Sequence, residues 1–68
     1  MFSDYVVYIK YLYTKGRFFS LNEKAETTIC VRAESERGAA ERARRQLEAD
    51  LKQKGYRLVN YSTNAKKM

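Results

Sequence analysis

The residues in this sequence that could bind another molecule are basic and aromatic side chains that stand close together along the chain. Tyr8 and Lys10 lie in an aromatic, β-branched run, and the segment Lys15-Gly16-Arg17-Phe18-Phe19 places cations and rings beside a glycine. Such a mixture can hold a nucleic-acid backbone and stack on a base. It can equally form a protein hot spot, where aromatic residues and arginine dominate. The candidate binding residues are Tyr8, Lys10, Leu12, Lys15, Arg17, Phe18, Phe19, Arg32 and Arg57.

Catalytic groups are scarce in this chain. It has no histidine, which is the commonest general base and metal ligand. Its single cysteine, Cys30, has no second thiol with which to form a disulfide or a zinc site. Gly16, Gly38 and Gly55 are scattered singly, so no glycine-rich phosphate loop is present. We therefore predict that the protein is not an enzyme and expect no catalytic residue, no metal and no cofactor.

Length and cysteine content indicate a small domain in a reducing compartment. A chain of 68 residues supports one domain with a modest core, and oligomerisation is the remaining way to reinforce it. A lone cysteine in a predicted strand fits a compartment where free thiols persist. The apolar run 5–9 ends at Lys10, far short of the roughly 20 residues that span a bilayer. We expect a cytoplasmic protein that does not associate with membranes.

The net charge is +6, from 14 Lys and Arg against 8 Asp and Glu, which favours a polyanionic partner. The helix between 35 and 54 is predicted to pair most of its own charges at a spacing of four residues. The predicted pairs are Arg37–Glu41, Glu41–Arg45, Arg44–Glu48 and Glu48–Lys52. The excess positive charge then lies on the cations outside the helix, which are Lys10, Lys15, Arg17, Lys24, Arg32, Arg57, Lys66 and Lys67.

Three strands and one helix must position these groups. Residues 4–14 and 56–62 have strand composition, and residues 26–33 alternate, with apolar side chains on one face only. Ser35 is a typical N-cap and Gly55 a typical helix stop. The predicted buried stripe of the helix is Ala39, Ala40, Ala43, Leu47 and Leu51. The pattern predicts one domain over residues 1–63 and a frayed basic tail over 64–68.

This order predicts an α+β fold of the ββαβ type, with a small antiparallel sheet and the helix packed on one face. The right-handed crossover rule brings the last strand back beside the first, which becomes central. Between residues 14 and 26 two interpretations stay open. Either an extra short strand forms near 17–21, or residues 15–24 form one long hairpin loop.

The central strand is apolar on both faces, which a sheet with one face in water does not require. Its odd-numbered residues can face the helix, while Val6, Tyr8 and Leu12 leave a second apolar face. The segment Phe18-Phe19-Leu21 could fold over this face, with one of the two phenylalanines in the core. A second copy of the chain could cover it as a homodimer, and so could a protein partner. Single-stranded nucleic acid could also do so, with a base stacked on Tyr8. Its phosphates would then be held by Lys10, Arg32 and Arg57.

The second half of the chain resembles a known class of small proteins. The segment Val31-Arg32-Ala33-Glu34-Ser35 leads into Ala39, Ala40 and Ala43, and Gly55-Tyr56 precedes the last strand. This pattern is similar to small phage- and plasmid-encoded hairpin–helix–strand proteins, among them phage inhibitors of host RNA polymerase and some anti-CRISPR proteins. The resemblance implies a protein that acts by binding and blocking something larger.

Together these observations predict a non-enzymatic basic binding module. Its first expected target is a protein or a protein–nucleic-acid complex, which it would assist or inhibit. The alternative is direct nucleic-acid binding through the basic and aromatic sheet face and the hairpin loop.

Overall fold

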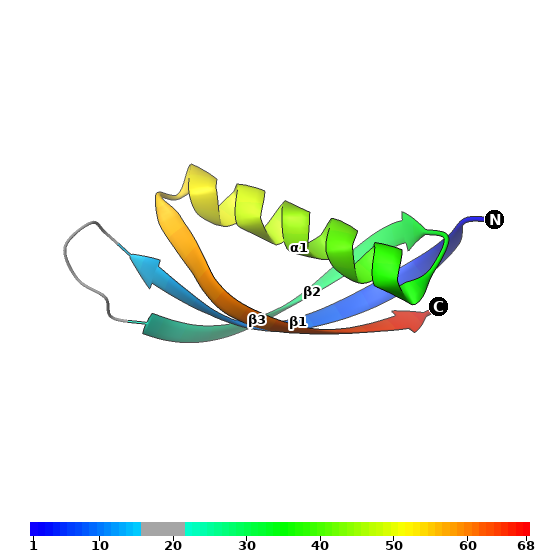
Figure 1. Ribbon diagram of the computed structural model, residues 1–68, viewed down its shortest axis with the longest axis horizontal. Coiled ribbons are helices and arrows are strands. Elements are labelled where there is room, and N and C mark those ends of the chain that lie inside the picture. The colour runs from blue at the N-terminus through cyan, green and yellow to red at the C-terminus, as the bar shows by residue number, and fades with distance from the viewer. Residues whose placement is uncertain (16–21) are drawn as a thin grey trace.

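The computed structural model describes residues 1–15 and 22–68 and shows a three-stranded antiparallel sheet with one helix on one face (Figure 1). The sheet order is β2-β1-β3, so the first strand is central, as predicted. The α+β class and the ββαβ order are confirmed. The elements in chain order are β1 (Ser3–Lys15), β2 (Asn22–Ala33), α1 (Glu36–Gln53) and β3 (Tyr56–Lys67).

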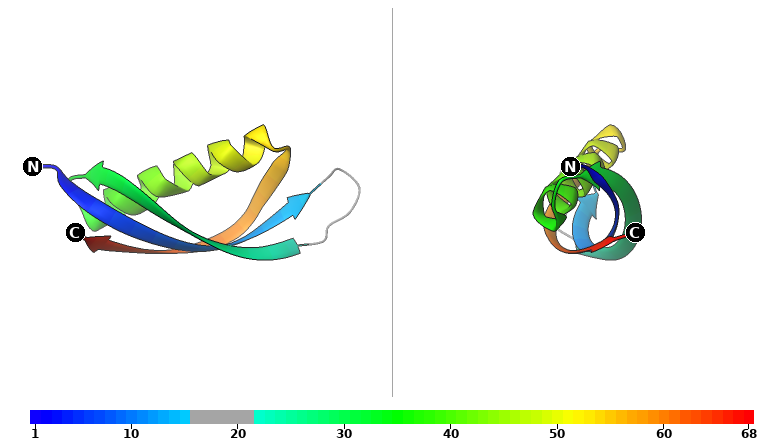
Figure 2. Two further views of the ribbon diagram at one scale, coloured as in Figure 1. Left: turned by 180° about the vertical axis from the view of Figure 1, so that it is seen from behind. Right: turned by 90° about the vertical axis from the view of Figure 1, so that its right-hand side faces the viewer.

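The two neighbours of β1 pair with it differently. The β1–β2 register runs without interruption from Ser3↔Ala33 to Thr14↔Asn22. The β1–β3 register shifts between Leu12 and Tyr13, which marks a β-bulge on the β3 side. Long strands of this kind twist and bend, and Figure 2 shows them curving beneath the helix. The curvature lets one helix cover most of one face of the sheet.

The ends of α1 follow the predicted signals. Ser35 is extended, and its side-chain oxygen accepts a hydrogen bond of 3.1 Å from the amide of Gly38. Glu36 places a negative charge in the first turn, where the helix dipole favours it. Gly55 has a φ of 79°, a left-handed conformation that ends the helix with little strain only for glycine. The chain can therefore reverse directly into β3.

The core lies between α1 and the odd-numbered side chains of β1. Val7 is fully buried, and Ile9 is only 1% exposed. The predicted helix stripe is confirmed, with Ala40 as its only partly buried member. Alanine in the first half of the helix allows its backbone to lie close to the sheet. The buried core residues are Tyr5, Val7, Ile9, Ala33, Ala39, Ala43, Leu47 and Leu51.

The predicted frayed tail from residue 64 is wrong for residues 64–67, because β3 extends through Lys67. Residues 65–67 pair with Tyr5–Val7 of β1, and the amide of Met68 donates to the carbonyl of Asp4 over 2.9 Å. The long central strand supplies backbone partners that a polar sequence does not reveal. An edge strand tolerates charged side chains because they reach water. The domain therefore extends past residue 63.

The alternative of one long loop over 15–24 is wrong at its ends, because Lys15 belongs to β1 and residues 22–24 belong to β2. The proposed short strand near 17–21 and the covering segment Phe18-Phe19-Leu21 lie outside the described residues 1–15 and 22–68.

Candidate binding surface on the open sheet face

The face of the sheet opposite α1 is referred to here as the open face. It consists of the even-numbered residues of β1 from Asp4 to Thr14 and the residues that the register places beside them on β2 and β3. Tyr8 is 47% exposed, and Val6 and Leu12 are partly buried. Among the described residues, no second element covers this face. Its apolar side chains are therefore in contact with solvent.

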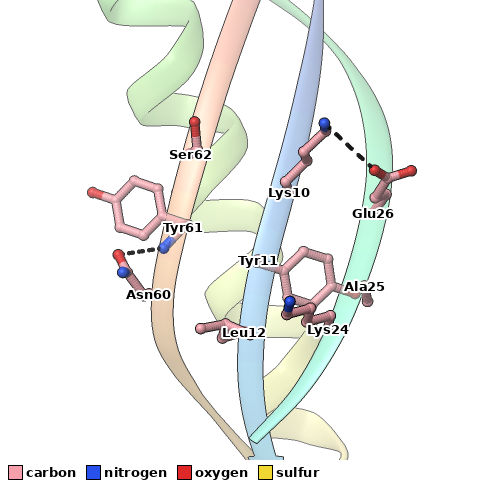
Figure 3. A pocket seen from close by; sticks show the side chains of 9 residues that line it. All are labelled: Lys10, Tyr11, Leu12, Lys24, Ala25, Glu26, Asn60, Tyr61 and Ser62. Carbon is pink, nitrogen blue, oxygen red and sulfur yellow. Dashed lines mark hydrogen bonds and ion pairs between the residues drawn. The ribbon is translucent and has the colours of Figure 1, made fainter.

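A shallow depression of about 520 Å³ lies on the open face around Leu12. Figure 3 shows the Leu12 side chain on the central strand, with Asn60 of β3 on one side and Lys24 of β2 on the other. Lys10 and Glu26 lie at its upper border. The lining is mainly apolar, although backbone and long side chains from all three strands contribute to it. An apolar floor with polar borders is suited to a protruding apolar side chain of a partner.

The open face carries a positive charge. Two ion pairs connect β1 with β2, Lys10–Glu26 at 3.9 Å and Asp4–Arg32 at 3.4 Å, and all four side chains are mostly exposed. Exposed pairs of this kind contribute about 0–1 kcal/mol each. The register also places Lys24, Arg57 and Lys66 on this face, and none of them has an acidic group within 4.0 Å among the described residues.

The five cations and two carboxylates give the open face a net charge of +3, which is half of the total of +6. The surplus lies at the two ends of the face, while the apolar side chains Val6, Tyr8 and Leu12 follow the central strand and are interrupted by the Lys10–Glu26 pair. Long-range attraction would therefore orient this face toward an acidic partner.

The predicted binding residues divide into three groups. Those that share the open face are Tyr8, Lys10, Leu12, Arg32 and Arg57. Lys15 lies on the opposite side of the sheet, beyond the C-terminal end of α1, and its charge is paired with Glu23. Arg17, Phe18 and Phe19 lie outside the described part of the chain. Lys15, which was predicted as part of the binding loop, therefore does not share the open face, because an odd-numbered residue of β1 points to the helix side.

Lys15 belongs to a polar and aromatic cluster that the sequence did not predict. The Tyr13 hydroxyl donates to Oε2 of Glu23 over 2.8 Å, and Nζ of Lys15 lies 3.3 Å from the same oxygen. Lys15 also lies above the rings of Tyr13 and Tyr56, which stack with centroids 5.4 Å apart. We call these four residues the Glu23 cluster. Alternation predicts that Tyr13 and Lys15 lie on the same side of the sheet. It does not predict that Glu23 lies opposite Tyr13, because the β1–β2 register cannot be read from the sequence.

The pKa values in the Glu23 cluster follow from these contacts. The hydrogen bonds from Tyr13 and Lys15 lower the pKa of Glu23 because they favour its charged form. The same hydrogen bond to Glu23 raises the pKa of Tyr13, since the hydroxyl must keep its proton to donate. Glu23 likewise raises the pKa of Lys15. Tyr13 is partly buried and Lys15 and Glu23 are about half exposed, so the cluster links the end of β1 to the start of β2 at the surface.

The predicted charge ladder on α1 is confirmed in part. Arg45 donates to Glu41 over 3.0 Å, and Arg44 pairs with Glu48. The described residues show no Arg37–Glu41 or Glu48–Lys52 pair within 4.0 Å, and the partners of Glu41 and Glu48 are Arg45 and Arg44. Arg44 also lies 5.8 Å from the centroid of the Tyr61 ring on β3. The helix surface therefore satisfies part of its own charge, as expected for a solvated face.

The described part of the chain holds neither a cluster of metal ligands nor a helix that could cross a membrane. Ranges 1–15 and 22–68 hold no group of three or more metal-ligating His, Cys, Asp or Glu side chains. Within the same ranges, no helix combines the length and apolar character needed to cross a membrane. Comparison with protein families, with curated proteins and with solved structures gave no match.

Proposed function

We propose that this protein is a non-enzymatic binding module that docks its open face on the acidic surface of a larger protein, which it assists or inhibits. The observation that supports this proposal is the combination on one face of an apolar row along β1, which only Lys10 interrupts, and a surplus of cations. Protein interfaces have this anatomy, with an apolar core that excludes water and a polar rim. The fold itself does not need Val6, Tyr8 and Leu12 to be apolar, because the helix packs on the other face.

The charge and the residue types specify the chemistry of the partner. A net charge of +3 on the face complements an acidic surface and speeds the encounter by electrostatic steering. Tyr8 and Leu12 are the side chains that could supply most of the binding energy, since aromatic residues in the centre of an interface often do so. The border cations Lys24 and Arg57 would contribute mainly to association rate and its salt dependence.

The proposal is tested by affinity capture with three bait proteins in nuclease-treated extract. Leu12→Glu adds one negative charge at the centre of the open face. Gln46→Glu adds the same charge on the exposed side of α1 and serves as the matched control. We expect wild type and Gln46→Glu to retain the same protein and Leu12→Glu to lose it. Equal retention by all three baits would exclude the open face as the docking surface.

A second candidate function is direct binding of single-stranded nucleic acid by the same face. Its specific support is the position of Tyr8, which is 47% exposed on the central strand and has Lys10 two residues away. Single-stranded nucleic acids bind to sheets that combine stacking rings with a cationic path for the backbone. Among the described residues, however, Tyr8 is the one aromatic side chain on the open face, so stacking would be limited to a single base.

Fluorescence anisotropy with single- and double-stranded oligonucleotides over a range of salt concentrations separates the two functions. If the protein binds nucleic acid directly, its affinity should fall steeply as the salt concentration rises. In Arg57→Gln, the slope of log affinity against log salt concentration should be smaller by the amount that one phosphate contact contributes. Absence of binding at low salt would exclude this second candidate and leave the protein-docking proposal intact.

A further inference from the structure

The two edges of the sheet differ in how their backbone groups are arranged. The carbonyl of Asp4 accepts from Met68, so the even-numbered residues of β1 direct their backbone groups toward β3. Its odd-numbered residues therefore bond to β2. Because Val7 pairs with Ile29, the odd-numbered residues of β2 bond back to β1. The even-numbered residues of β2, from Lys24 to Arg32, must then direct their N–H and C=O groups out of the free edge.

The edge formed by β3 is protected against pairing with another strand. Its bulge near Leu58 interrupts the regular spacing of backbone groups. The amide of Tyr61, which faces outward, donates to the side-chain oxygen of its neighbour Asn60 over 2.8 Å. Lys66 and Lys67 add charge at the end of the strand. Natural edges use such bulges and lysines to avoid unwanted strand addition.

The edge formed by β2 has neither a bulge nor a proline, and its charges on Lys24, Glu26 and Arg32 lie on either side of an uncharged middle. Its register with β1 contains no shift, and the chain has no proline. The middle of the edge carries two small side chains, Thr28 and Cys30, both exposed on the open face. The described hydrogen bonds include no partner for the outward amides of these two residues. A long, regular and open edge is a template for one more strand.

The sequence of β2 selects one way in which two copies could pair along this edge. The outward N–H and C=O groups of one copy must face those of the other. In an antiparallel pair, even-numbered residues of β2 therefore lie opposite even-numbered residues of the second copy. A two-fold axis at Ile29 places Glu26 opposite Arg32 of the second copy, and Thr28 opposite its Cys30. The symmetry repeats each of these contacts.

The neighbouring registers are less favourable. An axis at Thr28 would place Lys24 opposite Arg32 twice, and an axis at Cys30 would place Glu26 opposite Glu34 twice. Like charges directly opposite one another destabilise a sheet, whereas opposite charges stabilise it. An axis at Thr27 brings no opposite charges together.

We propose that two copies of this chain associate through antiparallel pairing of β2 with β2 about a two-fold axis at Ile29, which joins the two sheets into one of six strands. Pairing over residues 25–33 would form about eight hydrogen bonds, two in each of the four pairs of outward-facing residues, a number within the usual range for a protein interface. On the open face, a row of alternating charge then crosses four strands. It runs from Lys10 through Glu26 to Arg32 and Asp4 of the second copy.

The helix side of the edge fits the same arrangement. Ile29 is partly buried within its own chain and would meet its symmetry mate at the axis, where side chains of a non-hydrogen-bonded pair lie close. Ala25 would lie opposite Ala33, a small pair at the end of β2 over which α1 begins. The helix contacts β3 more extensively than β2. This dimer leaves the open face free, so it does not depend on the proposed function.

Matched proline substitutions test which edge associates, with sedimentation over a range of concentrations as the measurement. Thr28→Pro removes an outward N–H from β2 and leaves the bonds to β1 in place. Thr63→Pro does the same on the outer edge of β3 and is the control. We expect wild type and Thr63→Pro to dimerise, and Thr28→Pro to need at least about tenfold more protein, since two bonds are lost by symmetry. A monomeric wild type at high concentration overturns the proposal.

Disulfide formation tests the register, and it remains informative if the proline variant fails to fold. Both variants are made in the Cys30→Ser background, so that each chain has one thiol. In the proposed register, Ile29→Cys places the two thiols of the dimer opposite one another at the axis. Val31→Cys places each thiol opposite Thr27 of the other copy. Mild oxidation should give a covalent dimer at least about tenfold faster for Ile29→Cys, because a disulfide requires Cα atoms within about 7 Å. Equal rates would overturn the register. Dimerisation that is lost in Leu12→Glu would place the contact on the open face and overturn the edge pairing.

Discussion

The two faces of β1 have similar apolar residues but opposite environments. Val7 and Ile9 face α1 and are essentially fully buried, whereas Tyr8, which stands between them, is 47% exposed. Only the first set is needed to hold the helix on the sheet. The second set exposes apolar surface without contributing to that core, and such surface on a small protein often marks an interaction site. The comparison separates residues that stabilise the fold from residues that are available for a partner.

The largest expected effect comes from truncating the same residue type on each face. Val7→Ala removes two buried carbon atoms from a fully packed site and should lower the free energy of unfolding by roughly 2–3 kcal/mol. Val6→Ala on the open face should cost less than about 1 kcal/mol, because that side chain is only partly buried. Chemical denaturation of both variants measures the difference. Equal losses would mean that the open face is covered in the folded protein.

The next effect concerns the helix, which makes the two faces different. Ser35→Ala removes the side-chain oxygen that accepts from the Gly38 amide, and it should destabilise the protein by about 1 kcal/mol. Ser62→Ala makes the same change at an exposed position of β3 on the open face. That control should alter stability by less than about 0.5 kcal/mol. Thermal unfolding of the two variants compares them directly, and similar shifts would contradict the capping role.

The sequence predicted the residues on the helix-facing side of the sheet better than those on the open face. Alternation on β1 and the spacing of alanine and leucine on α1 were sufficient to place the core, because burial imposes a regular pattern. The end of β3 was missed, since Asn64–Lys67 form an edge strand through backbone bonds that composition does not encode. Tyr8, Lys10 and Leu12 were correctly placed together by their period of two. Lys15 was predicted as part of the binding loop, whereas it is the last residue of β1 and its odd position directs it to the helix side.

A smaller effect compares ion pairs on the two sides of the molecule. Glu41→Gln removes a hydrogen-bonded pair with Arg45 on the outer surface of α1 and should cost about 0.3–0.5 kcal/mol. Glu26→Gln removes the looser cross-strand pair with Lys10, 3.9 Å apart, and should change the stability of the single chain by less. Urea titrations at low and high salt check both values. A larger loss for Glu26→Gln that depends on protein concentration would instead point to its predicted contact in the edge dimer.

The smallest expected effect is a pH dependence at the Glu23 cluster on the helix side. The pKa of Glu23 is lowered in the folded protein from its ordinary value of 4.5, so the folded state holds this proton less tightly than the unfolded state. The contribution of the cluster is therefore present above that value and is lost as the pH falls through the lowered pKa. We expect the difference in unfolding midpoint between wild type and Glu23→Gln to shrink as the pH falls from 7 toward 3.

The alkaline side gives the complementary trend. The raised pKa values of Tyr13 and Lys15 mean that both groups keep their protons in the folded state at pH values where the unfolded chain begins to lose them. Their contribution is present below the ordinary pKa values and is lost as the pH rises through the raised ones. Glu23→Gln removes the carboxylate that causes both shifts, so this alkaline trend should also weaken in the variant. If the unfolding midpoint of the variant followed the wild-type pH profile at both ends, the contacts of the Glu23 cluster would not form in solution. The end of β1 and the start of β2 would then be held together by their backbone pairing alone.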